Sequence, residues 1–164
     1  MTAEPTLVYL DRHIFSVGEL SWTQGPLQPV TGPVCLVFEA RDQETFVTTG
    51  ISSGNVKVWG EAITSRPSMI AEGWEDIAEV SLTVRSGPLQ VMGIGGTTGP
   101  EVRLDACGPG DYRLRIHAKG RDTDYDAARL DAVEDYLILA WPEQPSPPTA
   151  LRTTSHTGEM ELNR

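Results

Sequence analysis

A stripe of basic side chains is the part of this sequence whose residue types could most readily do chemistry. In GPGDYRLRIHAKGRDTDYD (108–126), Arg113, Arg115 and His117 alternate with apolar residues, and Lys119 continues the pattern. Successive side chains of a β-strand point to opposite faces, so the basic groups would form one cationic face. Two arginines placed in this way could each bind a carboxylate or a phosphate through paired hydrogen bonds. Arg113, Arg115 and His117 are therefore candidate ligand-binding or partner-binding residues.

Neighbouring carboxylates decide whether this stripe is a site. The chain holds 23 Asp and Glu against 13 Lys and Arg, so acidic partners on adjacent strands are abundant. Cross-strand pairing with residues such as Glu101, Glu134 or Asp135 would neutralise the stripe and make it structural. Without such pairing the stripe would be open to an anion or an acidic partner.

A second candidate is the acidic cluster around a tryptophan in EGWEDIAE (72–79). Trp74 could anchor an interface, because tryptophan is enriched among the residues that dominate binding energy. Glu75 and Asp76 would then present complementary charge to a basic partner. The alternative is that Trp74 belongs to the core and the acids line a loop.

Three aspartates at alternate positions follow the stripe, namely Asp122, Asp124 and Asp126. Their spacing matches the first three ligands of a calcium loop, which also requires Gly at its sixth position and Glu at its twelfth. Those positions hold Ala127 and Val133. We therefore predict an ordinary solvated loop here and no metal site.

No residue pattern specifies catalysis or a cofactor. The glycine-rich segment GIGGTTG (93–99) lacks the Gly-Lys-Ser/Thr of a P-loop. The three histidines show no metal-ligand spacing, and the chain has no Gly-x-Ser-x-Gly elbow. We expect no catalytic residue and no cofactor, and a hydrolase built from dispersed carboxylates is the least favoured alternative.

The elements that must position these residues are short strands. Alternating or apolar runs, bounded by Gly, Pro, Ser and Asn, recur along the chain. The runs 44–52 and 55–63 flank a Ser-Gly pair and are typical of a β-hairpin. The predicted fold class is all-β, an antiparallel β-sandwich of about 8–10 short strands with at most one short helix near 125–135.

The strand that carries the basic stripe also predicts a core face. Tyr112, Leu114 and Ile116 lie on the side opposite the basic residues. A Gly-x-Tyr that opens a late strand of a sandwich packs its ring in the core while its hydroxyl reaches a nearby backbone group. We expect this arrangement at Tyr112.

Composition divides the chain into a domain and a tail. Residues 1–142 contain the strand signals and predict a single β-sandwich domain. Residues 143–164 are rich in Pro, Ser and Thr without an apolar period, which predicts a flexible tail.

The net charge of −10 narrows the choice of partners. Nucleic-acid and anionic membrane surfaces attract Lys and Arg, so we expect neither as a partner. A basic protein partner fits this charge, and an open sheet edge leaves homodimerisation open. The start of the chain lacks a basic segment followed by an apolar one, which predicts a cytoplasmic location.

Two late runs, GPGDYRLRIHAKGRD (108–122) and VEDYLILAWP (133–142), resemble a signature of small acidic bacterial β-sandwich proteins. Together with the run CLVFEA (35–40), the layout is also similar to the ComJ type of competence protein, an inhibitor of a DNA-entry nuclease. This resemblance implies a β-sandwich that binds and blocks a basic effector, and it implies no catalytic residue.

These observations lead to one preferred function and two alternatives. We expect a non-catalytic protein-binding module, such as an inhibitor or immunity partner of a basic nuclease or toxin. The first alternative is a small-ligand or anion-binding β-sandwich that uses Arg113, Arg115 and His117. The second is the hydrolase with dispersed carboxylates.

Overall fold

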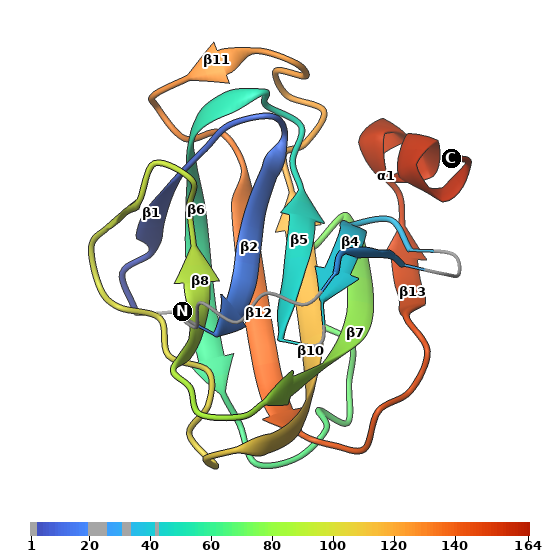
Figure 1. Ribbon diagram of the computed structural model, residues 1–164. Coiled ribbons are helices and arrows are strands. Elements are labelled where there is room, and N and C mark those ends of the chain that lie inside the picture. The colour runs from blue at the N-terminus through green and yellow to red at the C-terminus, as the bar shows by residue number, and fades with distance from the viewer. Residues whose placement is uncertain (1–2, 20–25, 31–33, 42) are drawn as a thin grey trace.

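Two β-sheets form the part of the chain that the computed structural model describes, which is residues 3–19, 26–30, 34–41 and 43–164 (Figure 1). The strands of the larger sheet are β1 (Thr6–Leu10), β6 (Ser53–Ala62), β7 (Asp76–Val84), β9 (Thr97–Thr98), β10 (Gly110–Lys119), β11 (Ala128–Arg129), β12 (Asp135–Pro142) and β13 (Thr149–Thr153). The strands of the smaller sheet are β2 (Ile14–Glu19), β3 (Gln28–Pro29), β4 (Val37–Arg41), β5 (Glu44–Thr48) and β8 (Leu89–Met92).

The larger sheet has the order β13-β7-β10-β12-β6-β1-β9, with β11 beside β6, and the smaller sheet has the order β3-β4-β5-β2-β8. Strand β6 pairs in parallel with β12 and β11, and the other pairings are antiparallel. Ten strands of the described part span four residues or more. The predicted all-β sandwich is confirmed.

The core lies between the sheets, and β10 contributes to it as predicted. Tyr112, Leu114 and Ile116 are buried. The Tyr112 hydroxyl donates to the carbonyl of Gly108 at 2.7 Å, so the expectation for this tyrosine is confirmed.

The predicted hairpin over 44–63 is wrong, because its two halves belong to different sheets. Strand β5 pairs with β2 and β4, whereas β6 pairs with β1 and β12. The crossing is held by the buried carboxylate of Glu134, which accepts from the backbone N–H of Gly50 at 2.9 Å and of Ile51 at 2.6 Å. Ser53 and Gly54 are the first two residues of β6, so the Ser-Gly pair marks the start of a strand rather than a turn.

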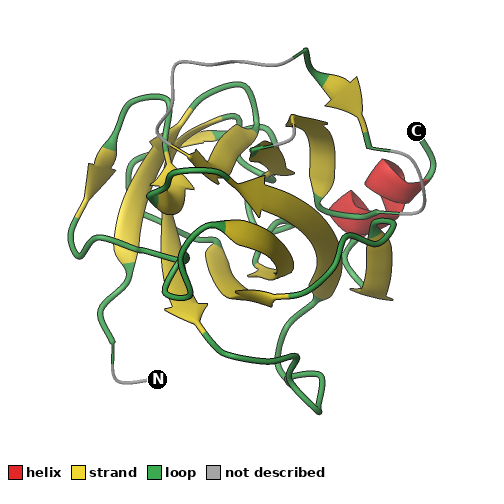
Figure 2. Cartoon of the chain, turned by 60° about the horizontal axis from the view of Figure 1, so that its bottom comes forward, coloured by secondary structure: helices red, strands yellow, loops and turns green. Residues whose placement is uncertain are grey.

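The single short helix of the described residues, α1 (His156–Leu162), lies in the C-terminal segment rather than near 125–135. Ser155 caps its start by accepting from the Gly158 N–H, and the Asp122 carboxylate accepts from the His156 and Thr157 N–H groups. These side-chain acceptors satisfy backbone donors that a helix start leaves unpaired. Figure 2 shows the helix beside the strand layers rather than between them.

The segment 143–164, which the composition predicts to be a flexible tail, contains β13 and α1. Strand β13 adds to the edge of β7, and Ser155 and Thr157 are buried. The open edge of β7 supplies ladder partners that composition alone does not reveal. The C-terminal segment is therefore part of the folded structure.

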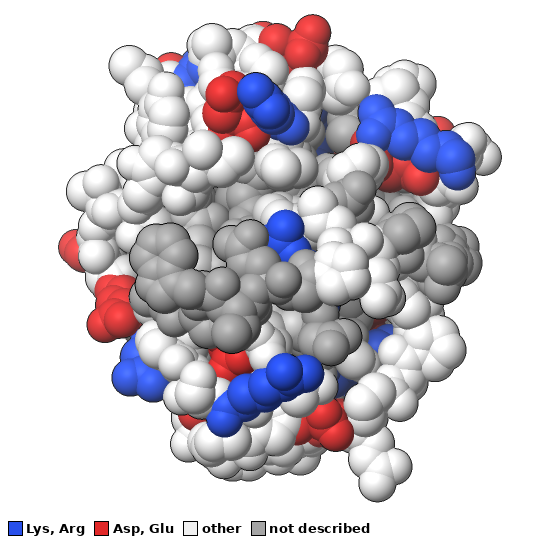
Figure 3. Space-filling view, in the orientation of Figure 1, with Lys and Arg blue, Asp and Glu red and all other residues white. Residues whose placement is uncertain are grey.

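Charged side chains of both signs share the face of the smaller sheet. Figure 3 shows Lys and Arg beside Asp and Glu on this face rather than in a patch of one sign. Within the described residues, no helix combines the length and apolarity needed to cross a bilayer.

Candidate functional site

The predicted basic stripe lies on the outer face of β10, but other segments cover it. Arg113, Arg115 and His117 are 2%, 3% and 0% exposed. Arg113 donates to the carbonyls of Ser146 at 2.8 Å and Pro147 at 2.9 Å, and Arg115 donates to that of Met69 at 3.1 Å. The segments around Met69 and Ser146 therefore close over the stripe.

A single carboxylate, Glu79, pairs with both arginines of the stripe. The antiparallel register of β7 and β10 places Glu79 opposite Arg115. Glu79 Oε2 lies 2.7 Å from Arg115 Nε, and Oε1 lies 3.3 Å from Arg113 Nε and 3.0 Å from Arg66 Nη1. Burial alone would raise the pKa of Glu79, but the hydrogen bonds from Arg115 and Arg66 outweigh it and lower this pKa. The expected cross-strand pairing with a carboxylate thus takes place.

The carboxylates that pair with the basic residues are mostly not those suggested by the sequence. Of the three suggested partners, Asp135 pairs with Lys119 at 3.8 Å. Glu134 instead accepts from backbone N–H groups and from the Tyr136 hydroxyl at 2.6 Å, and burial raises the pKa of its carboxyl group. Glu101 is exposed.

His117 is a neutral, buried histidine. Its Nδ1 lies 3.0 Å from the carbonyl of Leu137, to which it donates, and its ring lies 5.6 Å from that of Trp74. Burial lowers the pKa of His117. The side chain has no contact with solvent through which it could bind a ligand.

The acidic cluster lies beside the stripe, because Trp74 and Glu75 directly precede β7, which pairs with β10. The Glu75 N–H donates to the Ala118 carbonyl at 3.0 Å, and Lys119 Nζ lies 5.1 Å from the Trp74 ring centroid. Asp76 is fully buried. The structure therefore brings together the two groups of predicted site residues, but Asp76 faces the interior and not a partner.

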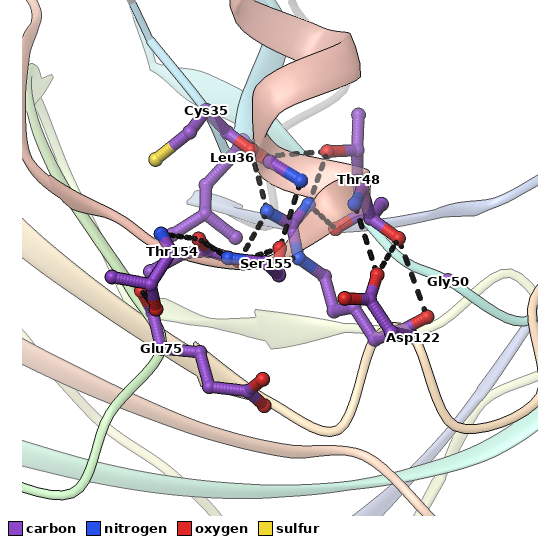
Figure 4. Close-up of polar contacts among 12 residues, drawn as sticks. Cys35, Leu36, Thr48, Gly50, Glu75, Asp122, Thr154 and Ser155 are labelled. Carbon is purple, nitrogen blue, oxygen red and sulfur yellow. Dashed lines mark hydrogen bonds and ion pairs between the residues drawn. The ribbon is translucent and has the colours of Figure 1, made fainter.

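Asp76 belongs to a buried polar network between the two sheets and α1. Arg121 Nη2 lies 2.8 Å from Asp76 Oδ2 and donates to the Cys35 carbonyl at 2.7 Å. Asp76 also accepts from the N–H groups of Thr154 at 3.1 Å and Ser155 at 3.2 Å. Figure 4 shows Cys35, Thr154 and Ser155 gathered around this network. These contacts are all internal to the protein, so we interpret the network as structural.

The three alternating aspartates diverge to separate partners. Asp122 caps α1, Asp124 pairs with Arg129 at 2.6 Å, and Asp126 pairs with His13 at 2.8 Å. Across the described part of the chain, no group of three or more His, Cys, Asp or Glu is arranged to hold a metal.

One hollow in the described surface lies at the end of β6, and we call it the Trp59 hollow. Its volume is about 530 Å³, and its lining is Ala3, Glu4, Trp59, Gly60, Glu61, Pro100, Glu101, Val102 and Arg103. The Trp59 indole N–H donates to the Ala3 carbonyl at 2.9 Å, which fixes the ring against the N-terminal segment. Gly60 allows segment 100–103 to approach, since a Cβ there would lie 2.0 Å from Val102 Cγ1.

The charge of the Trp59 hollow is negative. Glu4, Glu61 and Glu101 are exposed, and each lacks an ion-pair partner among the described residues. Arg103 lies 3.2 Å from Asp105, so its charge is already balanced. An indole face beside free carboxylates can hold an organic cation through cation–π and ionic contacts. The arrangement suits a Lys or Arg side chain.

Sequence reasoning missed this hollow. The alternation of Lys57, Trp59 and Glu61 along one strand face was visible, but it does not indicate a concave surface. The other wall comes from residues 3–4 and 100–103, which lie far away in the sequence. Only the pairing of β1 with both β6 and β9 brings these segments together.

Comparison with known proteins shows the fold alone. Neither a family model nor a curated protein sequence matches the chain. The chain is similar in structure to the protein "Crocagin biosynthetic gene J", with a TM-score of 0.53 and 15% sequence identity. The match covers 87% of this chain and 100% of the other.

Proposed function

We propose that the chain is a non-catalytic protein-binding module that holds a basic partner at the Trp59 hollow. The observation that carries this proposal is an indole wall in a hollow of about 530 Å³, flanked by three carboxylates that have no ion-pair partner among the described residues. Inhibition of a basic nuclease or toxin in the cytoplasm is the finer form of the proposal, and it rests on the ComJ-type resemblance.

The remaining surface charge supports a basic partner. Burial removes seven charged side chains of both signs from the described surface, namely Arg113, Arg115, Arg121, Glu19, Asp76, Glu79 and Glu134. The accessible charge therefore stays close to the −10 of the whole chain. A net field of this sign attracts a cationic protein and speeds its encounter.

Ion pairing leaves the excess of free charge on the acidic side. Most accessible bases already have a carboxylate partner, namely Arg41, Arg66, Arg103, Lys119, Arg129, Arg152 and Arg164. Glu4, Glu61 and Glu101 have none within the described part. These three carboxylates are therefore available to an incoming cation.

The internal contacts of the buried carboxylates support the proposal that the protein is not a catalyst. Asp76 holds Arg121, Glu79 holds Arg115, and Glu134 holds backbone amides. Each of these carboxylates is buried. They stabilise the fold and do not face a substrate.

A small organic cation is a second candidate ligand for the same hollow. The volume of about 530 Å³ falls within the range of about 300–1,000 Å³ found for small-molecule sites. The same indole and carboxylates would hold a quaternary or primary ammonium group.

Calorimetric titration distinguishes these proposals. We expect a lysine-rich peptide to bind, and the Glu61→Gln/Glu101→Gln double variant to weaken binding about tenfold, equivalent to about 1.4 kcal/mol. Trp59→Leu keeps the apolar bulk but removes the strong cation–π face, and we expect a loss of about threefold to tenfold. Glu159→Gln removes one charge on α1, away from the hollow, and should bind as the wild type does.

The outcomes separate the two ligand classes. Binding of the peptide but not of choline supports the protein partner, whereas tight binding of choline alone supports the small cation. Equal affinity of the peptide for the wild type and the double variant would contradict the protein-partner proposal, and equal affinity of choline for both would contradict the small-cation proposal.

A further inference from the structure

A second hollow lies around the tight turn between β1 and β2. We call it the turn hollow, and its volume is about 190 Å³. Its walls come from the turn, β4, the end of β5, the 121–127 loop and the end of α1. The lining residues include Arg12, His13, Phe38, Thr49, Tyr125 and Arg164. It shares no lining residue with the Trp59 hollow.

The backbone of this turn holds non-glycine residues in an unfavourable conformation. Arg12, His13 and Asp126 have φ of 56°, 63° and 63°, and they are the non-glycine residues with positive φ in the described part of the chain. Two consecutive positive φ values are typical of a type I′ turn, where Asn-Gly is preferred. Strained residues of this kind cluster at functional sites, where the side chain is needed in spite of the strain. Arg12 and His13 line the hollow, and Asp126 contacts His13 from outside the lining. This proximity points to a role for the Arg12 and His13 side chains.

The His13 ring is fixed between two acceptors. Its Nδ1 lies 3.1 Å from the Thr49 carbonyl, and its Nε2 lies 2.8 Å from Asp126 Oδ1. These two contacts hold the ring between Thr49 and Asp126. The Asp126 carboxylate is thereby engaged by His13.

Arg12 supplies the unbalanced charge of the turn hollow. Arg164 lies 3.3 Å from Glu161, which balances that pair. The Arg12 guanidinium has no carboxylate partner among the described residues, although it lines the hollow. A guanidinium fork matches the two oxygens of a carboxylate.

Two aromatic rings supply an apolar wall. Phe38 and Tyr125 are each 46% exposed, and the Tyr125 ring lies 5.6 Å from that of His13. The volume of about 190 Å³ lies below the range of about 300–1,000 Å³ of drug-sized sites. A single ring with one acidic group fits such a space.

We infer that the turn hollow binds a small aromatic carboxylate, with Arg12 holding the carboxylate and Phe38 and Tyr125 contacting the ring. A free aryl acid and the chain end of a peptide that finishes in Phe carry the same chemistry. Binding here is independent of the proposed role of the Trp59 hollow.

Calorimetry with 3-phenylpropionate and its amide tests this inference. We expect the acid to bind at least tenfold more tightly than the amide, because only the acid pairs with Arg12. Arg12→Gln should weaken binding of the acid at least tenfold, whereas Lys57→Gln, a matched loss of one cation on β6, should leave it unchanged. Arg12→Gly should lose binding without a fall in Tm, which separates a ligand contact from a structural role.

Two peptides ending in Phe, with a free and with an amidated chain end, identify the source of the carboxylate. Binding of the free acid alone assigns a small molecule, and binding of the peptide with a free end alone assigns a chain end. Equal binding of acid and amide, undiminished binding by Arg12→Gln, or no binding of any carboxylate at millimolar concentration would overturn the inference. A lysine-rich peptide is a different probe, so its result leaves this one unaffected.

Discussion

Replacement of Glu79 by Gln tests whether the basic stripe is held by internal pairing. Glu79 is 2% exposed and contacts Arg115 at 2.7 Å and Arg113 at 3.3 Å. Loss of one partner of a buried ion pair costs about 3–5 kcal/mol, because the other charge stays buried without compensation. Here the carbonyls of Met69 and Ser146 still accept from these arginines, so we expect the lower end, about 3 kcal/mol.

Urea denaturation of the wild type and Glu79→Gln measures this loss. Glu143→Gln is the matched control, because Glu143 also pairs with Arg66 but is 29% exposed. A partly exposed pair contributes about 0–1 kcal/mol, so the control should lose no more than this. A loss below about 1 kcal/mol for Glu79→Gln would refute the reasoning, since it would place the variant among such surface pairs.

The stability difference between the wild type and Glu79→Gln should also depend on pH. The lowered pKa of Glu79 means that its contribution is present above the ordinary glutamate pKa of about 4.3. This contribution is lost as the pH falls through the lower pKa of the folded state. The stability difference between wild type and Glu79→Gln should therefore narrow below about pH 4, and a constant difference down to pH 2 would contradict the pairing.

Three further predictions concern the turn, the C-terminal segment and the thiols. Arg12→Gly should raise the free energy of unfolding by about 0.5–1 kcal/mol. Relief of about 1–2 kcal/mol of left-handed strain in the folded state exceeds the cost of about 0.4–1 kcal/mol from the greater entropy of the unfolded chain. A lower Tm in calorimetry would contradict this. A chain ended at Pro142 lacks β13 and the Ser155 contacts of Asp76, so circular dichroism should show an unfolded or strongly destabilised protein, and an unchanged Tm would restore the tail interpretation. Exposed Cys107 should react with a thiol reagent in the native state, whereas Cys35, whose pKa is raised by burial, should react only in denaturant. Rapid reaction of both thiols in the native protein would contradict the burial of Cys35.

Local sequence pattern predicted the core face of β10 but not the partners of its basic face. The alternation of Tyr112 and Leu114 with arginines follows from strand geometry and needs no tertiary information. That Glu79 lies opposite Arg115 follows from the register of β7 and β10, two strands about 30 residues apart in the sequence. Register depends on burial across the whole sheet, so no local signal selects Glu79 over Glu101.

Sequence composition did not reveal α1 and β13 for a related reason. The composition around 125–135 favours helix weakly, whereas α1 forms at 156–162 because Asp122, from a distant loop, accepts from its first backbone donors. The Trp59 hollow likewise joins three separate segments. The fold class was thus accessible from periodicity, and the site required the long-range pairings.

A two-dimensional ¹H–¹⁵N NMR titration with a lysine-rich peptide tests the central claim most directly. The Trp59 indole N–H, which bonds to the Ala3 carbonyl, is a resolved reporter inside the hollow, and the amides of Gly60 and Val102 report its two walls. We expect the largest shifts at these three groups, with weaker binding at higher salt. Shifts that spare all three, or no shifts at low salt, would contradict the assignment of the Trp59 hollow as the contact surface for a basic partner.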